Sequence, residues 1–317
     1  MSELSGRSIM QTSKIIVIAG PTASGKSGLA LDVAKQTNGV VINADSMQVY
    51  KDIPILAASP SKEDIAIAPH KLYGIYDASV RGNVVDWLNL CKQEILEAQN
   101  HNSTPVIVGG TGMYIEALTK GVTPIPETPQ EVRNTVEEII SNEGLEFLYH
   151  KLQEIDKDTA NKLSENDTTR IKRAMEVWYH TGKNLTYWHS IPLINHFNPQ
   201  DFIKIYIKPP REVLDIRGKL RFDIMMKQGA LSEVEKLVER NLSDSLPAMR
   251  ALGVQELKSY ILGKMSLTDA IEEAKLHTRQ YAKRQSTWFN NRFDADFCLN
   301  TCYDEDKNFV EDIKNSI

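Results

Sequence analysis

The loop at residues 20–27 has the residue types and spacing that bind a chain of phosphates. It lies between a strand-like apolar run, Ile15–Ala19, and a helix-like segment, residues 28–36, as such a loop requires. Backbone N–H groups would hold the anion, Lys26 would add a positive charge, and the Ser27 hydroxyl could ligate Mg²⁺. The alternative, a chance glycine turn, does not account for this context. The predicted phosphate-binding residues are Gly20, Pro21, Thr22, Ala23, Ser24, Gly25, Lys26 and Ser27.

An acidic residue, Asp45, follows the second apolar run, Val40–Ala44. It therefore stands at the carboxyl edge of a predicted sheet, where folds of this kind place their active sites, and it should face the bound phosphates. The spacing alone leaves three interpretations open. Asp45 could be a Mg²⁺ ligand, a general base, or the N-cap of a following turn.

A third apolar run, Pro105–Val108, ends in Gly109-Gly110-Thr111-Gly112 where a metal-binding aspartate is common. This second loop of small residues opens a helix-like segment and offers another set of amide donors. Close packing of a tight turn would explain the glycines almost as well. The threonine among them favours a function for Thr111, as a contact to a phosphate oxygen.

Two arginines, Arg217 and Arg221, lie four residues apart on one predicted helix face, so both could reach the same site. Arginines beside a phosphate loop commonly neutralise a leaving group. The alternative is a solvated face on which Asp215 and Asp223 are their surface partners.

The segment 274–293 contains no acidic residue, although the chain has a net charge of −5. It interleaves bases with aromatic residues at helical spacing, which is typical of a track for a phosphate backbone. A smaller basic patch contains Arg170, Lys172 and Arg173. A solvated face is the alternative for both. The residues of the longer stretch are Lys275, Arg279, Tyr281, Lys283, Arg284, Trp288, Phe289 and Arg292.

The elements that must position these residues follow an α/β pattern. Short β-branched runs, the last at Phe202–Ile207, alternate with helix-like segments, which predicts a P-loop core with a parallel sheet covered by helices on both faces. Residues 121–199 show helical patterns only and are expected to form an all-helical insertion domain, entered through a proline-rich linker at 123–129. The expected division is a disordered leader at 1–13, a core at 14–120 and 200–300, the insertion at 121–199 and a polar tail at 303–317.

The composition fits one class of protein and excludes others. The chain has 317 residues, of which 41% are hydrophobic and 25% charged, enough for a large core. Its three cysteines are too few for a disulfide framework, and its histidines show no metal-ligand spacing. No apolar stretch approaches the roughly twenty residues that span a bilayer. We therefore expect a cytoplasmic protein without a membrane partner.

In these motifs the chain resembles the bacterial tRNA dimethylallyltransferase family, also called tRNA isopentenyltransferase, from Lys14 to about Leu299. It departs from the family pattern at residues 55–60 and at Asn290, which leaves the local substrate contacts there open. The matching motifs are Gly20 to Ser27, Ala44-Asp45-Ser46, Gln48-Val49-Tyr50, Pro69-His70, Val108 to Tyr114, Asp167 to Glu176, Arg250 to Gly253 and Thr278 to Gln285.

The resemblance implies transfer of a dimethylallyl group from dimethylallyl diphosphate to the exocyclic amine of the adenosine immediately 3′ of the anticodon. The loop would then hold the diphosphate, and Asp45 would be the base that takes the amine proton. Departing diphosphate would be stabilised by the loop amides and Lys26, with Mg²⁺ on Ser27, and by Thr111 and Arg221. The reactive base would be extruded from the anticodon loop, and the enzyme would be a monomer.

The resemblance also implies which residues contact the anticodon stem-loop of the tRNA, and they include both basic patches. The implied contacts are Asp45, Ser46, Met47, Gln48, Thr111, Arg133, Thr169, Arg170, Ile171, Lys172, Arg173, Arg250, Ala251, Leu252, Gly253, Val254, Gln255, Arg279, Gln280, Lys283, Arg284 and Gln285.

Two other functions compete with this one. A small-molecule kinase using ATP would need the same loop, but it would have no use for the acid-free basic stretch. An RNA-binding module without activity would not need an intact Lys26, Ser27 and Asp45.

Overall fold

The structure, a computed structural model, describes residues 13–304 and 307–316. Residues 1–12 of the expected leader lie outside this range. None of the described helices is long and apolar enough to cross a membrane.

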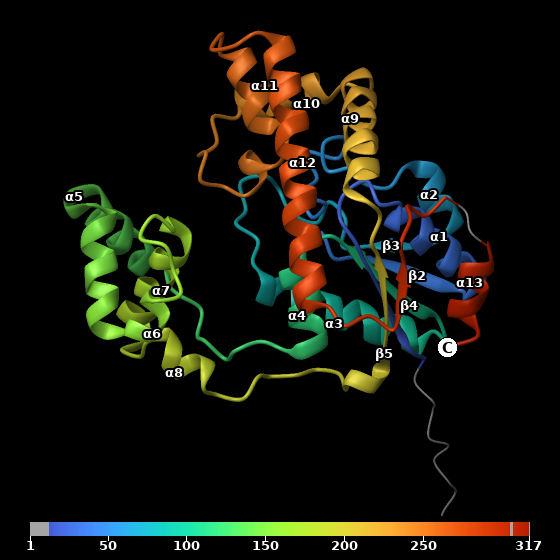
Figure 1. Cartoon of the computed structure of the whole chain (residues 1–317), viewed down its shortest axis with the longest axis horizontal. Coiled ribbons are helices and arrows are strands. Elements are labelled where there is room, and N and C mark those ends of the chain that lie inside the picture. Colours follow the sequence, from blue (N-terminus) through green and yellow to red (C-terminus); the bar gives the residue numbers. More distant parts are fainter. Residues whose placement is uncertain (1–12, 305–306, 317) are drawn as a thin grey trace, which may run out of the picture. The chain divides into compact units, whose positions relative to one another are not determined.

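The core is a six-stranded parallel sheet in the order β3-β2-β4-β1-β5-β6. Its strands β3, β2, β4 and β5 are labelled in Figure 1. The prediction of an α/β fold with a parallel sheet is therefore confirmed, and β1, which feeds the phosphate loop, is a central strand. The two short edge strands, β3 and β6, were not predicted. The strands are β1 (Ile15–Ala19), β2 (Gly39–Asn43), β3 (His70–Lys71), β4 (Thr104–Gly109), β5 (Phe202–Ile207) and β6 (Phe297–Leu299).

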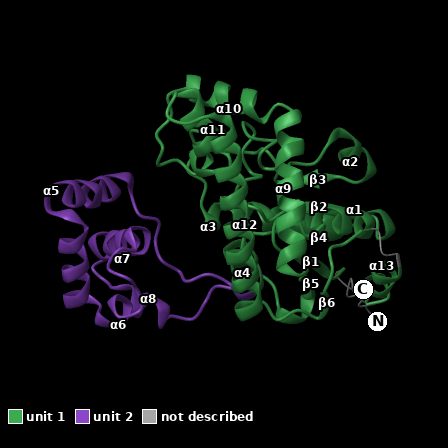
Figure 2. Cartoon of the chain, turned by 45° about the horizontal axis from the view of Figure 1, so that its top comes forward, with its two compact units in different colours: residues 1–119, 197–317 green, residues 120–196 purple. Residues whose placement is uncertain are grey.

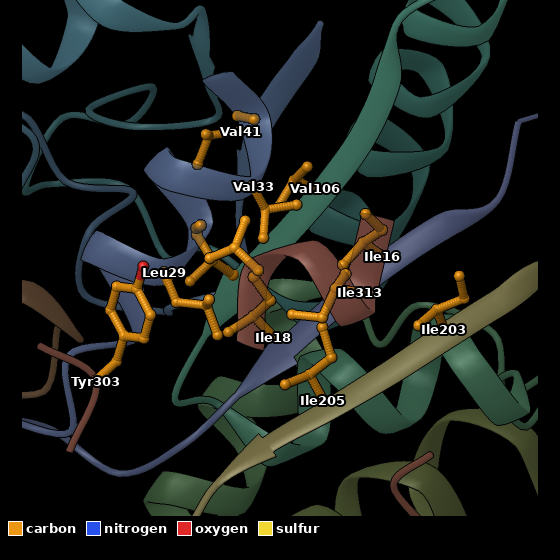
Figure 3. Packing of buried hydrophobic residues seen from close by; sticks show 14 of the residues in the cluster. Ile16, Ile18, Leu29, Val33, Val41, Val106, Ile203, Ile205, Tyr303 and Ile313 are labelled. Atoms are coloured by element: carbon orange, nitrogen blue, oxygen red, sulfur yellow. The ribbon is translucent and has the colours of Figure 1, made fainter. Parts of the chain in front are cut away.

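Helices cover both faces of this sheet. Side chains of successive strand residues point to opposite faces, so the buried residues of β1 pack on both sides. Ile16 and Ile18 of β1 pack in one apolar cluster with Leu29 and Val33 of α1 (Figure 3). Ile15 and Val17, also fully buried, alternate with them and lie outside that cluster. On this second face α3 contacts β2 and β4.

Thirteen α-helices lie in the described part of the chain. They are α1 (Lys26–Gln36), α2 (Lys62–Ile67), α3 (Val84–Asn100), α4 (Gly112–Lys120), α5 (Gln130–Ile155), α6 (Lys157–Ala160), α7 (Thr168–Thr181), α8 (Leu185–His189), α9 (Arg211–Lys227), α10 (Ala230–Glu239), α11 (Val254–Ile261), α12 (Leu267–Arg292) and α13 (Lys307–Lys314).

The chain forms two compact units, residues 1–119 with 197–317, and residues 120–196 (Figure 2). The second unit differs by at most three residues at each end from the insertion expected at 121–199, whereas the first unit continues past the expected end of the core at residue 300. The second unit is all-helical within its own described elements and has a core of its own around Val136, Leu148 and Met175. Its first helix, α5, is kinked at Gly144, whose φ of 87° is left-handed and favours glycine.

The segment expected to be a polar tail is instead part of the core unit. Tyr303 is buried, and α13 places Val310 and Ile313 in the cluster that also contains Leu29 and Val33. The segment looked polar because these few apolar residues are spaced among charged ones. A spacing of three residues on a helix nevertheless puts Val310 and Ile313 on one face, which is enough to bury them.

Candidate active site

A cavity of about 320 Å³ opens in the core unit at the carboxyl ends of the central strands. Loops after β1 and β2 form one side of it, and α9, α12 and the turn before α11 form the rest. Its lining residues are Thr22, Lys26, Ser27, Asp45, Ser46, Met47, Gln48, Leu56, Ala57, Gly218, Arg221, Phe222, Met225, Arg250, Ala251, Leu252, Thr278, Tyr281 and Arg284.

The first loop, residues 20–27, turns sharply from β1 into α1. Ala23 and Gly25 both have left-handed backbones, with φ of 65° and 88°, and α1 begins at the next residue, Lys26. The N-terminus of α1 therefore opens at the cavity, where Lys26 and Ser27 form part of the wall. A helix N-terminus with a lysine and a hydroxyl is an anion-binding arrangement.

Lys26 is held inside this loop. Its Nζ donates to the carbonyl of Pro21 at 3.3 Å. Desolvation of the ammonium lowers the pKa of Lys26 to about 8, with Asp45 acting against that change and Arg221 in its favour. The half-buried lysine thus lies near both Asp45 and Arg221 at the cavity wall, where its charge would act on a bound anion.

Asp45 follows β2 and has one oxygen engaged. Its Oδ1 accepts from the N–H of Met47 at 2.9 Å, while the side chain of Asn43 accepts from its own N–H at 2.8 Å. The turn-capping interpretation therefore holds for that oxygen. Among the described residues Oδ2 has no hydrogen-bond partner, and Asp45 lines the cavity, so this oxygen is available for a base or a ligand role.

The second loop, residues 109–112, is a packed turn. A Cβ on Gly109 would lie 2.0 Å from the carbonyl oxygen of Ala44, and one on Gly112 would lie 2.4 Å from the ring of Trp288. The hydroxyl of Thr111 accepts from the N–H of Ser46 at 2.9 Å. Close packing thus accounts for these glycines, and Thr111 lies behind Ser46, holding the turn that carries Asp45.

Gln285 of α12 joins the two loops. Its Oε1 accepts from the N–H of Thr22 at 2.8 Å, and its Nε2 donates to the carbonyl of Gly110 at 2.8 Å. The side chain is buried, and these two backbone groups are the partners of its amide oxygen and nitrogen. The resemblance implied a tRNA contact for Gln285, whereas these bonds give it a role in fixing the loops, which the sequence pattern did not indicate.

The two arginines of α9 separate. Arg221 lines the cavity, and its Nη1 lies 3.5 Å from the Thr22 hydroxyl; desolvation lowers its pKa, and Asp45 opposes that change. Arg217 instead pairs with Asp304, at 2.9 Å from Nη1 to Oδ1. The expectation that both reach the same site therefore holds for Arg221 only.

One wall of the cavity is apolar, which the sequence analysis missed. Leu56, Phe222 and Met225 are buried there and come from two segments far apart in the chain. The segment 54–58 that carries Leu56 is held by two side chains. Gln48 donates to the carbonyls of Ala57 and Ala58 at 3.0 and 2.8 Å. The Glu233 carboxylate accepts from the N–H groups of Ile55 and Leu56 at 2.8 and 3.3 Å.

The basic stretch on α12 divides along the helix. Arg284 and Tyr281 line the cavity, with the guanidinium 5.7 Å from the ring centroid, and burial raises the pKa of Tyr281. Arg279 and Lys283, with Gln280, line an exposed groove between α9 and α12. Lys275 is paired with Asp223 at 2.8 Å, so the stretch offers only part of its charge to a ligand.

The turn around residues 250–255 is mixed in the same way. Arg250, Ala251 and Leu252 line the cavity, and the exposed Arg250 donates from Nε to the carbonyl of Asp244. Gly253 and Val254 are buried, and Gly253 has a φ of 87° that suits glycine. Any contact that these two make with RNA would go through the backbone.

The remaining predicted tRNA contacts belong to the second unit. On α7, Thr169 and Arg170 are exposed, whereas Ile171 is fully buried in that unit's core. Lys172 pairs with Glu137, and Arg173 donates to the hydroxyl of Thr128 at 2.8 Å. Arg133, on α5, is half-buried.

Together, the parallel sheet and this cavity define a P-loop α/β protein. Its site combines an anion-binding helix N-terminus, the Asp45 carboxylate and an apolar wall. The model of the family described as IPP transferase matches residues 48–292. The chain belongs to this family, whose members include the tRNA dimethylallyltransferases.

Relatives and solved structures agree. The chain is 45% identical over 283 residues to the tRNA dimethylallyltransferase of Zymomonas mobilis, covering 88% of each chain. It is similar to the crystal structure of the tRNA isopentenylpyrophosphate transferase of Bacillus halodurans, with a TM-score of 0.69 at 32% identity, covering 96% of this chain and 95% of that one. A eukaryotic dimethylallyltransferase acting on tRNA matches with a TM-score of 0.80 at 29% identity, covering 95% of this chain and 77% of that one.

Proposed function

We propose that this protein transfers a dimethylallyl group from dimethylallyl diphosphate to the N6 amine of the adenosine immediately 3′ of the anticodon in tRNA, releasing diphosphate. The observation that carries the proposal is the single cavity that places Lys26, Asp45 and the apolar wall around one space. A small-molecule kinase using ATP would have no need of that wall between its phosphate loop and a basic helix.

In the proposed reaction the first loop holds the leaving group. The bond between the allylic carbon and the diphosphate oxygen breaks, and the charge that builds on diphosphate is stabilised by the loop amides, Lys26 and Arg221. Prenyltransferases of this family use a divalent metal ion. We propose Mg²⁺, held by the exposed hydroxyl of Ser27 together with diphosphate oxygens, where it would neutralise further charge. Hydroxyl and carboxylate oxygens at this wall fit such a hard cation.

Asp45 is proposed as the base. The exocyclic amine of adenine is a weak nucleophile because its lone pair is delocalised into the ring. As the new N–C bond forms, the amine becomes strongly acidic, and a carboxylate can take its proton. The N–H of Met47 occupies Oδ1, and Oδ2, which has no hydrogen-bond partner in the described part of the chain, would take the proton in this step. Thr111 supports it by fixing the N–H of Ser46; its implied contact with the leaving group stays a prediction.

The apolar wall would receive the dimethylallyl group beside the loop, with Leu56, Phe222 and Met225 excluding water from the allylic carbon. The adenine must leave its stack to reach this depth, so we propose base extrusion into the cavity. Arg284 and Arg250 at the wall would meet the flanking phosphates.

The other tRNA contacts implied by the resemblance, on α7, α12 and the turn at 250–255, remain part of this proposal. They include exposed bases that suit phosphate contacts, among them Arg170, Arg279 and Lys283. The three free cysteines are compatible with a reducing compartment, and we propose a cytoplasmic enzyme that acts as a monomer.

The base is tested by Asp45→Asn, which keeps an oxygen that can accept from the N–H of Met47. Purified protein, Mg²⁺, dimethylallyl diphosphate and unmodified tRNA are incubated, and nucleosides are quantified by mass spectrometry. We expect prenylated adenosine with the native chain and a turnover about 10²- to 10⁴-fold lower with the variant. The tRNA affinity should stay within about threefold, since a base contributes little to binding. An equal loss of affinity and turnover would make Asp45 a binding contact instead.

The proposed tRNA contacts on α12 are tested by the double substitution Lys283→Ala and Arg284→Ala. Both side chains are exposed, and we expect weaker tRNA binding with a salt dependence whose slope is shallower by about one to two. Lys35→Ala, an exposed lysine on α1, is the matched control and should leave the slope unchanged. An unchanged slope in the double variant would return this part of α12 to a solvated face.

A further inference from the structure

The segment Cys302–Asp304 lies against the outside of the first loop. The N–H of Tyr303 donates to the carbonyl of Ser24 at 3.0 Å, and the thiol of Cys302 lies 3.8 Å from the carbonyl of Ala23. Cys302 and Tyr303 are both buried, and the Tyr303 ring lies beside Leu29 of α1 (Figure 3). The carbonyls of Ala23 and Ser24 are thus both contacted by a segment near the C-terminal end of the chain.

The loop is shaped for this close approach. A Cβ at Gly25 would lie 2.4 Å from the carbonyl oxygen of Tyr303 and 3.0 Å from its nitrogen, both backbone atoms that cannot turn away. A Cβ at Gly28 would meet only the Tyr303 ring, at 3.6 Å, an ordinary contact. Gly25 therefore has two reasons to be glycine, its left-handed φ of 88° and the backbone of Cys302–Asp304 against it.

Side chains fix the same segment at two points. The Tyr303 hydroxyl donates to Asp32 of α1 at 2.5 Å. Asp304 accepts from Arg217 of α9, at 2.9 Å to Oδ1 and 3.1 Å to Oδ2. Arg221, one turn further along α9, lies at the cavity side of the loop near Thr22. Helix α9 thus contacts the loop itself through Arg221, on the cavity side, and contacts the segment Cys302–Asp304 through Arg217.

We propose that Cys302–Asp304 is a positioning strap for the phosphate loop and that the Arg217–Asp304 pair fastens it. The strap holds the backbone of residues 23–25 in the conformation that binds diphosphate, so its loss lowers the affinity for the diphosphate group. This inference rests on the proposed role of the loop in holding that group. It gives Arg217 a positioning role, in which this arginine acts on the loop through Asp304. The family match gives Arg217 no such role.

The direction in which one substitution changes the affinity for diphosphate distinguishes the strap from a purely electrostatic effect. Asp304→Asn removes a negative charge from a segment beside an anion site, so attraction alone would leave diphosphate binding unchanged or strengthen it. Loosening of the strap would instead weaken diphosphate binding. Because Asp304 is 70% exposed and Arg217 36% exposed, the pair is a modest fastening, and we expect the diphosphate affinity to fall about two- to fivefold.

The experiment titrates inorganic diphosphate with Mg²⁺ into the full chain and measures KM for dimethylallyl diphosphate. The variants are Asp304→Asn, Arg217→Asp, Asp304→Arg and the swap that combines the last two. We expect a weaker affinity and a higher KM in each single variant, recovery in the swap, and a tRNA affinity within about twofold of the native value. Asp312→Asn removes the same charge from the exposed face of α13 and should change nothing.

Unchanged or tighter diphosphate binding in Asp304→Asn, or a swap no better than its single variants, would overturn the strap. A lower melting temperature with unaltered KM would also overturn it, since that is the mark of a purely structural contact. Tyr303→Phe, which removes the bond to Asp32, gives a second route and should raise KM in the same direction. Lys26→Met separates the two proposals. If it leaves diphosphate binding intact, the role of the loop fails; if it abolishes binding while the strap variants do nothing, only the strap fails.

Discussion

The two loops of small residues, 20–27 and 109–112, look alike in sequence and differ in the structure. Both follow a buried parallel strand and both open a helix. The first presents Lys26, Ser27 and the N-terminus of α1 to the cavity. The second is filled from outside by Ala44, Gln285 and Trp288, and its threonine faces Ser46.

This difference shows that glycine in a loop after a strand has more than one cause. Gly25 needs a left-handed backbone as well as room beside the Tyr303 backbone, whereas Gly109, whose φ is not left-handed, needs room only, because Ala44 backbone atoms lie where its Cβ would be. The first loop is therefore the one suited to diphosphate, and the second is suited to placing the turn that carries Asp45. Three predictions test that division of roles.

The largest effect should come from Lys26→Met, which removes the charge of the first loop and keeps most of the volume of the side chain. Loss of a preorganised contact to a developing anion should lower kcat by about 10²- to 10³-fold and raise KM for dimethylallyl diphosphate. Steady-state kinetics with saturating tRNA measure both. A variant with native KM and kcat would show that the first loop does not bind the leaving group.

A smaller effect is expected for Thr111→Val, which keeps the shape of the second loop and removes its hydroxyl. Without the bond to the N–H of Ser46, the turn of Asp45 shifts, and we expect kcat to fall about 10- to 100-fold with an almost native KM for dimethylallyl diphosphate. Thr111→Ser retains the hydroxyl and is the control. A rise in KM as large as that of Lys26→Met would make the second loop a phosphate cradle as well.

The smallest effect is a pH dependence that belongs to the first loop. In the free site the pKa of Lys26 is lowered to about 8, chiefly by desolvation, so the lysine is charged below that pH and loses its charge above it. The KM for dimethylallyl diphosphate, measured from about pH 7 to about pH 9.5, should therefore be flat at first and then rise by at most about tenfold per unit. The same rise should appear in Thr111→Val. A flat profile through pH 9.5 would assign the binding charge to Arg221 alone.

Much of the fold could be predicted because it depends on local patterns. The strands β1 and β5 follow from runs of apolar, largely β-branched residues. The edge strands β3 and β6 were too short to give a pattern. Helix α13 was missed because its apolar residues Phe309, Val310 and Ile313 stand among charged and polar ones.

The meeting of Lys26 and Asp45 at one cavity could be predicted, because each belongs to a loop at the carboxyl edge of the sheet. Their roles in the reaction stay predictions. The candidate site could not be predicted where distant segments meet. The apolar wall joins Leu56 to Phe222, and Gln285 bridges Thr22 to Gly110. Nothing in the local sequence of Gln285 distinguishes a bridging amide from an RNA contact, because the difference lies in which backbone groups the fold brings to it.

The division between the loops is tested most directly by calorimetric titration of inorganic diphosphate with Mg²⁺ into the native chain, Lys26→Met and Thr111→Val, without tRNA. The account predicts that Lys26→Met binds diphosphate at least about tenfold more weakly than the native chain, and that Thr111→Val binds it within about twofold. Native affinity in Lys26→Met, or an equal loss in both variants, would contradict it.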